Sequence, residues 1–594
     1  MTDDDNDPFA HLHDEHYRDR FNRPLVGHRD MVFMGGRDRI ALAGPWRFAL
    51  DLFDEGLRQR WFADTPGPPE TWPVPRDYDA SGGETIEVPS CFTAVRPEWR
   101  YFEGGAWYTR DIDGSTFDPD ARVVLRVGAA NYAARVFLNG RFLAAHMGGS
   151  TPFFVELTGH LESGQNRLQI NVDNRRDPRR VPMHHIDWFN HGGLFREVDL
   201  IALPPVFIRD VSVALAPGGD GSRIAVAVRL SDRADGNADV FVPELRVAAT
   251  VPIEAGQGGA IIDAAPDLWS PDTPRLYDVG IRFGDDRVSD RVGFRDIRVD
   301  GERILFNGDD VYLRGICVHE DDAEHGRVTS EADLRRRFAH MRELGCNFAR
   351  LAHYPHHERA AEIADEVGIM LWAEIPVYWA IRFKDRTTYA DAENQLLELI
   401  ARDRNRASVI MWGVGNENAD TDARFKFMSG LADTARQADP SRLVTAACLI
   451  NRETFRIEDR LADALDIIGL NEYFGWYEPD VGPLRTLLAN SNPGKPVVIS
   501  ETGADALAGF HGSLTTFFTE ERQAQFYRDQ FAVLSLCDYV RGVCPWLLYD
   551  FRSERRQMAL QGGFNRKGLI AEDKATKKQA FDVVAAHYRA MLGN

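Results

Sequence analysis

Three patterns of hydrophobic and polar positions follow one another along the chain. From about residue 41 to 205, and again from 206 to 300, short segments alternate apolar and polar residues, as half-buried β-strands do. Asn139-Gly140 directly follows one of these segments and predicts a tight hairpin turn. Beyond residue 300, strand-like runs alternate with amphipathic helical stretches. The chain therefore predicts two β-sandwiches followed by an α/β domain.

The α/β part contains eight strand candidates, each an apolar run bounded by polar residues. They are 311–319, 347–355, 369–376, 409–417, 443–449, 467–473, 496–501 and 543–551. Helical stretches such as 331–344, 391–404, 520–535 and a C-terminal helix at about 574–591 lie around them. Eight such units predict a (β/α)8 barrel. The predicted domains are an arm (1–40), a jelly-roll sandwich (41–205), an immunoglobulin-like sandwich (206–300) and the barrel (301–594).

Composition narrows the possible partners. The chain has 594 residues and a net charge of −21, which argues against nucleic acid and against an anionic membrane surface. Six cysteines are scattered without a CxxC pair, so we interpret them as buried thiols and expect neither disulfides nor a metal site. The polar, acidic N-terminus does not resemble a secretory signal, and no apolar stretch reaches about 18 residues. We expect a cytoplasmic protein.

Two carboxylates each close an apolar run. Glu501 ends Pro496-Val-Val-Ile-Ser, and Glu417 directly follows the run 408–416. Burying an ionisable group at the end of such a strand is costly unless it has a purpose, and barrel active sites lie at strand ends. Two facing carboxylates can cleave a glycosidic bond; we predict a separation of roughly 5–5.5 Å, the retaining geometry. Glu501 would be the nucleophile, and Glu417 would first donate and then accept the proton.

Longer motifs around both carboxylates resemble one enzyme family. Trp412-Gly-Val-Gly-Asn-Glu417 and Lys495-Pro-Val-Val-Ile-Ser-Glu-Thr-Gly-Ala-Asp505 are similar to the acid/base and nucleophile motifs of glycoside hydrolase family two. The family also has the predicted domain order. The resemblance implies that Asn416 binds the sugar 2-hydroxyl and that Tyr473 hydrogen-bonds the nucleophile. The sequence has no nucleotide-binding glycine motif, haem motif or metal-ligand spacing, so we expect no organic cofactor. The resemblance implies a homo-oligomer, as is common in the family.

Two further segments resemble the β-glucuronidases within this family. They are Asn471-Glu-Tyr-Phe-Gly-Trp-Tyr477 and Asn565-Arg-Lys567. The resemblance implies that Asn565, Lys567 and Tyr477 hold the uronic acid carboxylate. A neutral galactoside would leave the Lys567 ammonium buried and unpaired. Asp187, in a polar and aromatic segment of the first sandwich, matches the loop that touches sugar hydroxyls in this family.

Other polar and aromatic residues at predicted strand ends suit a sugar pocket. We expect His319, Asn471 and Trp546 to contact substrate, with Trp546 stacking on the sugar's apolar face. Arg350 and His353 would support the site, and Arg350 would orient Glu501.

The chain departs from the β-glucuronidase pattern at several positions. Asn418 follows the acid/base where those enzymes usually have proline, and Glu472 stands where a basic residue is expected. The connection after Ile375 is too short for the lid loop of some gut enzymes. We therefore expect a mouth open to larger or oligosaccharide substrates.

These residues leave three interpretations of the function. The first is a retaining exo-β-glucuronidase acting on a carbohydrate substrate. The second is a β-galactosidase or β-galacturonidase of the same family. The third, of another class, is a non-catalytic carbohydrate-binding protein, against which the intact pair Glu417 and Glu501 argues.

Overall fold

The protein folds into two compact units. The computed structural model describes residues 20–63, 83–218 and 221–592. The first unit comprises residues 1–30, 38–175 and 191–205, and the second comprises 31–37, 176–190 and 206–594. The arm predicted for residues 1–40 falls outside the described residues as far as residue 19.

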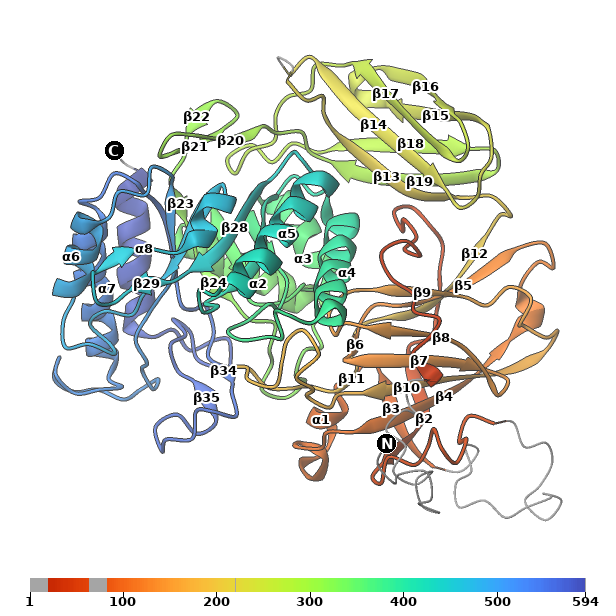
Figure 1. Ribbon diagram of the computed structural model, residues 1–594, viewed down its shortest axis with the longest axis horizontal. Coiled ribbons are helices and arrows are strands. Elements are labelled where there is room, and N and C mark those ends of the chain that lie inside the picture. The colour runs from red at the N-terminus through yellow and green to blue at the C-terminus, as the bar shows by residue number, and fades with distance from the viewer. Residues whose placement is uncertain (1–19, 64–82, 219–220, 593–594) are drawn as a thin grey trace, which may run out of the picture. The chain divides into compact units, whose positions relative to one another are not determined.

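The first unit is a β-sandwich, as predicted. One sheet has the strand order β3-β2-β4-β10-β7-β8, and the other has the order β1-β12-β5-β9 (Figure 1). Asn139 and Gly140 join β7 to β8 with φ angles of 49° and 76°, which confirms the predicted hairpin turn. The strands are β1 Ile40–Ala41, β2 Gly44–Asp51, β3 Glu84–Val88, β4 Gly105–Asp113, β5 Arg122–Val127, β6 Ala130–Asn131, β7 Ala133–Leu138, β8 Arg141–Met147, β9 Phe153–Glu156, β10 Gln165–Asp173, β11 Gly193–Leu194 and β12 Val198–Leu203, with a short helix α1 at Phe92–Val95.

The second unit begins with the immunoglobulin-like sandwich that the alternating pattern predicted. A sheet in the order β13-β14-β17 lies against a sheet in the order β16-β15-β18-β19, and every second residue of these strands faces a shared apolar core. A three-stranded sheet, β20-β21-β22, leads to the barrel. The strands are β13 Ile208–Leu215, β14 Arg223–Leu230, β15 Gly236–Val242, β16 Val247–Ile253, β17 Gln257–Asp263, β18 Tyr277–Phe283, β19 Asp286–Val292, β20 Ile297–Asp300, β21 Arg303–Phe306 and β22 Asp309–Asp310.

The rest of the second unit is a closed parallel barrel. Its strand order is β23-β33-β32-β31-β28-β27-β26-β25-β24. Because β23 and β24 are successive pieces of the first strand, their pairing with β33 and β25 closes the sheet into eight positions. The strands are β23 Leu313–Arg314, β24 Cys317–Val318, β25 Phe348–Leu351, β26 Met370–Glu374, β27 Val409–Asn416, β28 Leu443–Cys448, β31 Ile467–Asn471, β32 Val497–Thr502 and β33 Val540–Pro545, and two hairpins, β29 Ile450–Asn451 with β30 Arg456–Ile457 and β34 Phe551–Arg552 with β35 Phe564–Asn565, decorate it.

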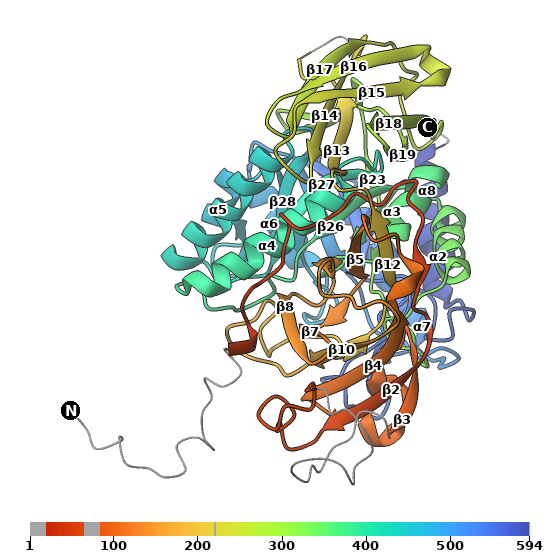
Figure 2. The same cartoon turned by 90° about the vertical axis from the view of Figure 1, so that its right-hand side faces the viewer.

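The helices α2 to α8 cover the barrel strands (Figures 1 and 2). Their buried apolar faces form one cluster with the outward side chains of the strands. Ser330 begins α2 with a capping box that it forms with Asp333. The helices are α2 Glu331–Leu344, α3 Glu358–Val367, α4 Arg386–Asp403, α5 Asp422–Ala438, α6 Gly482–Asn490, α7 Glu520–Leu534 and α8 Gln579–Leu592.

The structure moves several predicted boundaries. α4 begins five residues before the predicted start at 391, because the Asp385 carboxylate accepts from the first free amides, those of Thr387 and Thr388. α8 begins at Gln579, later than the predicted 574. The eighth strand spans 540–545 rather than 543–551, and the buried residues that follow Pro545, from Trp546 to Tyr549, lie outside the strand.

A buried ion pair ties α5 to the segment after β28. Arg424 and Asp459 have fully buried side chains, and their two parallel hydrogen bonds measure 2.5 and 2.8 Å.

Arg424→Met should lower the free energy of unfolding by about 3–5 kcal/mol, because the Asp459 carboxylate would stay buried without its cation. Denaturant unfolding measures this change. Adding Asp459→Asn should restore part of the loss, and a double variant no more stable than the single one would contradict the explanation.

Candidate active site

Acidic and polar side chains gather at the carboxyl ends of the barrel strands. Glu501 lies in β32, Asn471 ends β31, and Glu417 directly follows β27. Arg350 lies in β25, and Glu374 ends β26. All but Glu417 are at least nine-tenths buried. The barrel thus brings together residues that are up to 151 positions apart in the sequence.

Arg350 is the hub of this group. Its guanidinium is fully buried and donates to Glu501 at 2.8 Å, to Glu374 at 3.0 and 3.1 Å, and to the Asn416 side-chain oxygen at 2.8 Å. His353 joins through Nδ1, which lies 2.8 Å from Glu374. Charge-assisted hydrogen bonds to two carboxylates offset the desolvation cost of burying this guanidinium. It fixes the orientation of Glu501.

Burial opposes the ionisation of Glu501, whereas its hydrogen-bond partners favour it. The Tyr473 hydroxyl donates to its second oxygen at 2.7 Å, and His353 Nε2 lies 3.6 Å from the first. Burial raises the pKa of Glu501 to about 8; Arg350 opposes this rise and the Glu417 charge adds to it. Glu501 therefore keeps its proton to higher pH than an exposed glutamate would.

Glu417 is held at both oxygens. Asn471 Nδ2 donates to one at 3.0 Å, and the Trp379 indole N–H donates to the other at 2.8 Å. Its backbone φ is 51°, a left-handed conformation that costs a non-glycine residue energy and is concentrated at functional sites. Asn471 also binds the hub, because its side-chain oxygen lies 3.4 Å from Arg350. One carboxamide therefore connects the surroundings of both carboxylates.

Lys567 lies beyond Tyr473 in the same pocket. Its ammonium is 5.7 Å from the centre of the Tyr473 ring and only 1 % of the residue is exposed. It donates to Asp505 at 2.5 Å and to the Tyr477 hydroxyl at 3.2 Å. Burial would lower the pKa of Lys567, but the charges of Asp505 and Tyr477 outweigh it and hold the pKa above its ordinary value.

The expectation that a neutral sugar leaves Lys567 unpaired is therefore wrong. Asp505 belongs to the nucleophile motif, four residues after Glu501, and neutralises the ammonium before any substrate binds. Asn565 lies beside this pair, and its side-chain oxygen accepts from the Lys567 backbone amide at 3.2 Å.

Asp187 reaches the barrel mouth from the segment 176–190. Its carboxylate accepts from Ser553 at 2.7 Å and forms an ion pair with Arg556. Arg556 acts electrostatically on Asp505 and Tyr477 as well. A second cation therefore stands near Lys567, although no basic residue directly precedes the Asn565–Lys567 motif.

Aromatic rings form the floor around these groups. His353 stacks on Trp546 with ring centres 5.0 Å apart, and His319 meets Trp546 edge-on at 5.2 Å. Trp188 packs on both histidines. Burial is the main cause that holds the pKa values of His319 and His353 well below the ordinary range, so both rings are neutral.

Four residues of this arrangement were missed in the sequence. Glu374 shows the same signal as Glu417, a carboxylate that ends an apolar run, and could have been found. Trp379, Asp505 and Arg556 lie in loops without a periodic pattern, and only the folded chain brings them to the site.

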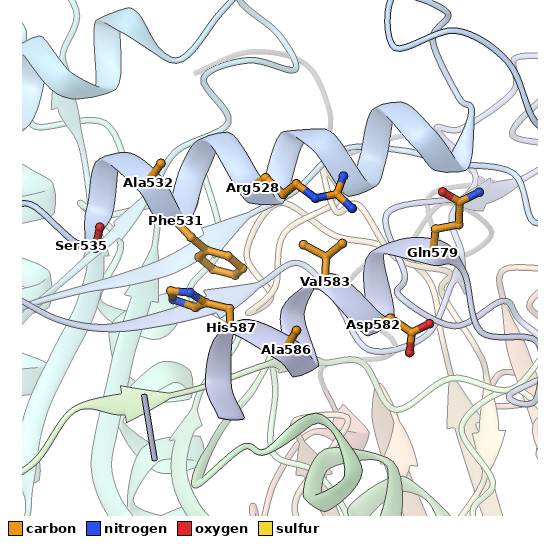
Figure 3. Close-up of a pocket in the computed structure, with 9 residues that line it drawn as sticks. All are labelled: Arg528, Phe531, Ala532, Ser535, Gln579, Asp582, Val583, Ala586 and His587. Atoms are coloured by element: carbon orange, nitrogen blue, oxygen red, sulfur yellow. The ribbon is translucent and has the colours of Figure 1, made fainter. Parts of the chain in front are cut away.

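A second surface feature lies away from the site. A groove between α7 and α8 (Figure 3) contains none of the predicted site residues. The residues lining the groove are Arg528, Phe531, Ala532, Ser535, Gln579, Asp582, Val583, Ala586 and His587.

In the described ranges, no group of three or more His, Cys, Asp or Glu side chains is arranged to hold a metal ion. None of the helices in these ranges combines the length and apolar character that crossing a bilayer requires.

Three family models match the chain in succession. They are the sugar binding domain of the glycosyl hydrolases family 2 at residues 40–204, the "Glycosyl hydrolases family 2" model at 208–295 and the family's TIM barrel domain at 297–591. The chain belongs to glycosyl hydrolase family 2. It is therefore a glycoside hydrolase, and the predicted family and fold class are confirmed.

Relatives of this family 2 hydrolase include beta-glucuronidases and a beta-galacturonidase. A beta-glucuronidase of Paenibacillus borealis is 29% identical over 587 residues, covering 91% of this chain and 95% of the relative. The Homo sapiens beta-glucuronidase is 29% identical and covers 92% and 90%. The solved beta-glucuronidase of an uncultured Clostridium sp. has a TM-score of 0.83 at 27% identity, covering 95% of this chain and all of that one. A beta-galacturonidase from Eisenbergiella tayi, solved with galacturonate, has a TM-score of 0.80 at 24% identity over 94% and 99%, and shares the fold.

The raised pKa of Glu501 predicts a pH-dependent cost to stability. The folded state keeps the Glu501 proton up to about pH 8, whereas the unfolded chain releases it near its ordinary value, so stability is lost as pH rises between the two. Glu501→Gln carries no such charge. It should stabilise the protein by roughly 2–4 kcal/mol more at pH 8.5 than at pH 4.5.

Thermal unfolding of both forms at the two pH values measures this difference. Glu453→Gln, at an exposed position, is the matched control and should show none. An equal effect of Glu501→Gln at both pH values would contradict the assignment.

Proposed function

We propose that this family 2 hydrolase is a retaining, exo-acting β-glucuronidase that removes terminal β-D-glucuronic acid from glycosides. The observation that carries the proposal is the buried Lys567 ammonium, which lies 5.7 Å from the centre of the Tyr473 ring, whose hydroxyl donates to Glu501. An ammonium has three donors, and Asp505 and Tyr477 take two of them. The third can bind a sugar carboxylate, and a neutral sugar would leave it unused.

The charges around Lys567 support an anionic sugar. Two cations, Lys567 and Arg556, face two carboxylates, Asp505 and Asp187. A uronic acid brings a further negative charge to a corner where both cations act together, while Asn565 and Tyr477 add neutral groups. Because Lys567 is 1 % exposed, protein lies behind it, and this end of the pocket suits a terminal sugar.

The catalytic roles follow from the contacts of the two carboxylates. Arg350 and Tyr473 favour the anionic form of Glu501, which would attack the anomeric carbon. Glu417 would give its proton to the glycosidic oxygen as the bond to the leaving group breaks. Glu417 would then take a proton from water, and the water oxygen would displace Glu501 from the sugar.

Asn416 is oriented for the sugar hydroxyl next to the reacting carbon. Its side-chain oxygen accepts from Arg350 at 2.8 Å and from Asn471 at 3.0 Å. This leaves its NH2 group as a donor for the 2-hydroxyl, a contact that can strengthen in the transition state.

Removing the ammonium should reveal the preference for a uronic acid. Lys567→Met should lower kcat/KM on an aryl β-D-glucuronide by about 100-fold, because a charge-assisted bond is lost and Asp505 is left unpaired. The double variant Lys567→Met with Asp505→Asn removes the unpaired charge and should still cleave the glucuronide much more slowly than wild type, because it also lacks the ammonium. Lys577→Met, whose side chain pairs with Glu343, is the control.

A panel of aryl β-glucuronide, galacturonide, galactoside and mannoside measures the sugar preference. The glucuronide should be cleaved fastest. Preference for the galacturonide would favour the second member of the family, since its carboxylate meets the same ammonium. Full glucuronide cleavage by Lys567→Met would contradict a carboxylate site at Lys567.

Replacing either catalytic carboxylate tests the two roles. Glu501→Ala with azide should form an α-glycosyl azide, because the small anion enters from the side that the carboxylate vacates. Glu417→Ala with azide should form the β-glycosyl azide from an activated substrate, because the sugar is first transferred to Glu501. NMR of the products distinguishes the two, and the reverse outcome would exchange the roles.

A further inference from the structure

Trp379 is locked beside Glu417. Its backbone amide donates to the Asn416 carbonyl at 2.9 Å, and its indole N–H donates to Glu417 at 2.8 Å. Both Trp379 and Glu417 have a φ of 51°, so two non-glycine residues accept a left-handed conformation to make this contact.

Asn418 secures this arrangement. It is fully buried, and its side-chain NH2 donates to the carbonyls of Trp379 at 3.0 Å and of Val377 at 3.3 Å. A proline here would offer no such donor. The departure from the β-glucuronidase pattern at Asn418 is therefore coupled to the position of Trp379.

Trp379 marks the leaving-group side of the acid/base. The oxygen of Glu417 that accepts from Asn471 faces the Arg350 hub and Glu501, where the sugar would bind. The other oxygen faces Trp379. Because the acid must touch the glycosidic oxygen between sugar and leaving group, the leaving group passes next to Trp379.

The Arg555 guanidinium lies over the Trp379 ring and forms no ion pair within the described residues. Its guanidinium carbon is 4.6 Å from the centre of the indole, and the side chain is exposed. Its sequence neighbours are engaged, since Glu554 pairs with Arg176 at 3.1 Å and Arg556 pairs with Asp187. Within the described part of the chain, Arg555 makes no ion pair.

A stacked guanidinium keeps its edge available. The cation–π contact uses the flat face of the guanidinium. The N–H donors along its edge can still form two parallel hydrogen bonds with a carboxylate or a sulfate. The ring of Tyr378 also stacks on Trp379, at 4.5 Å, and stiffens the support.

We infer that Arg555, supported by Trp379 and Asn418, selects an anionic leaving group, such as an acidic sugar or a carboxylated aromatic alcohol. Arg555 is the specificity residue, and Trp379 and Asn418 are positioning residues. The inference deepens the proposed function and rests on it. It also specifies which leaving groups would be preferred at the mouth that the sequence predicts to be open, namely anionic ones.

The test compares 4-carboxyphenyl with 4-carbamoylphenyl β-D-glucuronide on the full-length protein. The intrinsic reactivities of these substrates cancel when the ratio of their kcat/KM values is compared between wild type and variants. Arg555→Gln should lower the ratio for carboxylate over carboxamide by about three- to five-fold, mainly through KM, and high salt should lower it in wild type. Arg555→Lys should lower it less. Arg528→Gln, in the groove of Figure 3, removes an exposed arginine elsewhere and should leave it unchanged.

The positioning role of Trp379 has its own readout. Trp379→Phe removes the donor to Glu417 but keeps an aromatic support. A misplaced acid matters most for poor leaving groups, so this variant should lose at least about ten-fold on a phenyl glucuronide and much less on a 2,4-dinitrophenyl glucuronide. An equal loss on both would show a merely structural role.

The outcomes separate the inference from the proposed function. A ratio that Arg555→Gln leaves unchanged, in an enzyme that cleaves both glucuronides, overturns the inference alone. The same two leaving groups on galacturonides report the ratio if the enzyme prefers that sugar. Failure to cleave any of the four compounds overturns the proposed function and this inference with it.

Discussion

The site depends on one buried cation. Arg350 has no exposed surface, and it joins Glu374, Glu501 and Asn416 through hydrogen bonds of 2.8 to 3.1 Å. Without it, the buried carboxylates of Glu374 and Glu501 would have little to offset their repulsion. Because Arg350 lies in a barrel strand, it is held more rigidly than an arginine in a loop would be. Its hydrogen bond to Glu501 restrains that carboxylate in turn.

A contrast between two ends of the pocket follows from this. At Glu501, burial opposes the negative charge and raises the pKa of this carboxyl group to about 8. At Lys567, burial is overcome by Asp505, and the cation persists. One pocket thus has an end poised to exchange protons and an end with a permanent charge, and this division suits acid–base chemistry on a charged sugar.

The position of the candidate site could be predicted from the sequence because Glu417 and Glu501 each end an apolar run. A buried strand leaves a strong signal, and an ionisable group at its end contradicts the local pattern enough to be noticed. The order of sandwiches and barrel followed from the change in periodicity at about residue 300. The boundaries of α4 and α8 were less predictable, because capping by Asp385 and the turn before Gln579 depend on single residues.

The partners of the charges could not be predicted. Lys567 and Asp505 are 62 residues apart, and nothing in either segment shows that they meet. Arg556 and Trp379 come from irregular loops, whose paths depend on tertiary contacts rather than on periodicity. The departure at Asn418 was visible in the sequence, but its meaning required the two carbonyls that it binds.

The segment 176–190 has a consequence for the modularity of the enzyme. It lies in the chain before the immunoglobulin-like sandwich, yet it delivers the Trp188 ring to His353 and the Asp187 carboxylate to Ser553. An excised barrel starting at residue 297 would retain Glu417 and Glu501 and lose the Asp187 and Trp188 side chains, which contact Ser553 and His353 in the intact chain. Gene fragments or fusions that keep only the last domain would inherit the reactive centre without the surface that recognises what enters it.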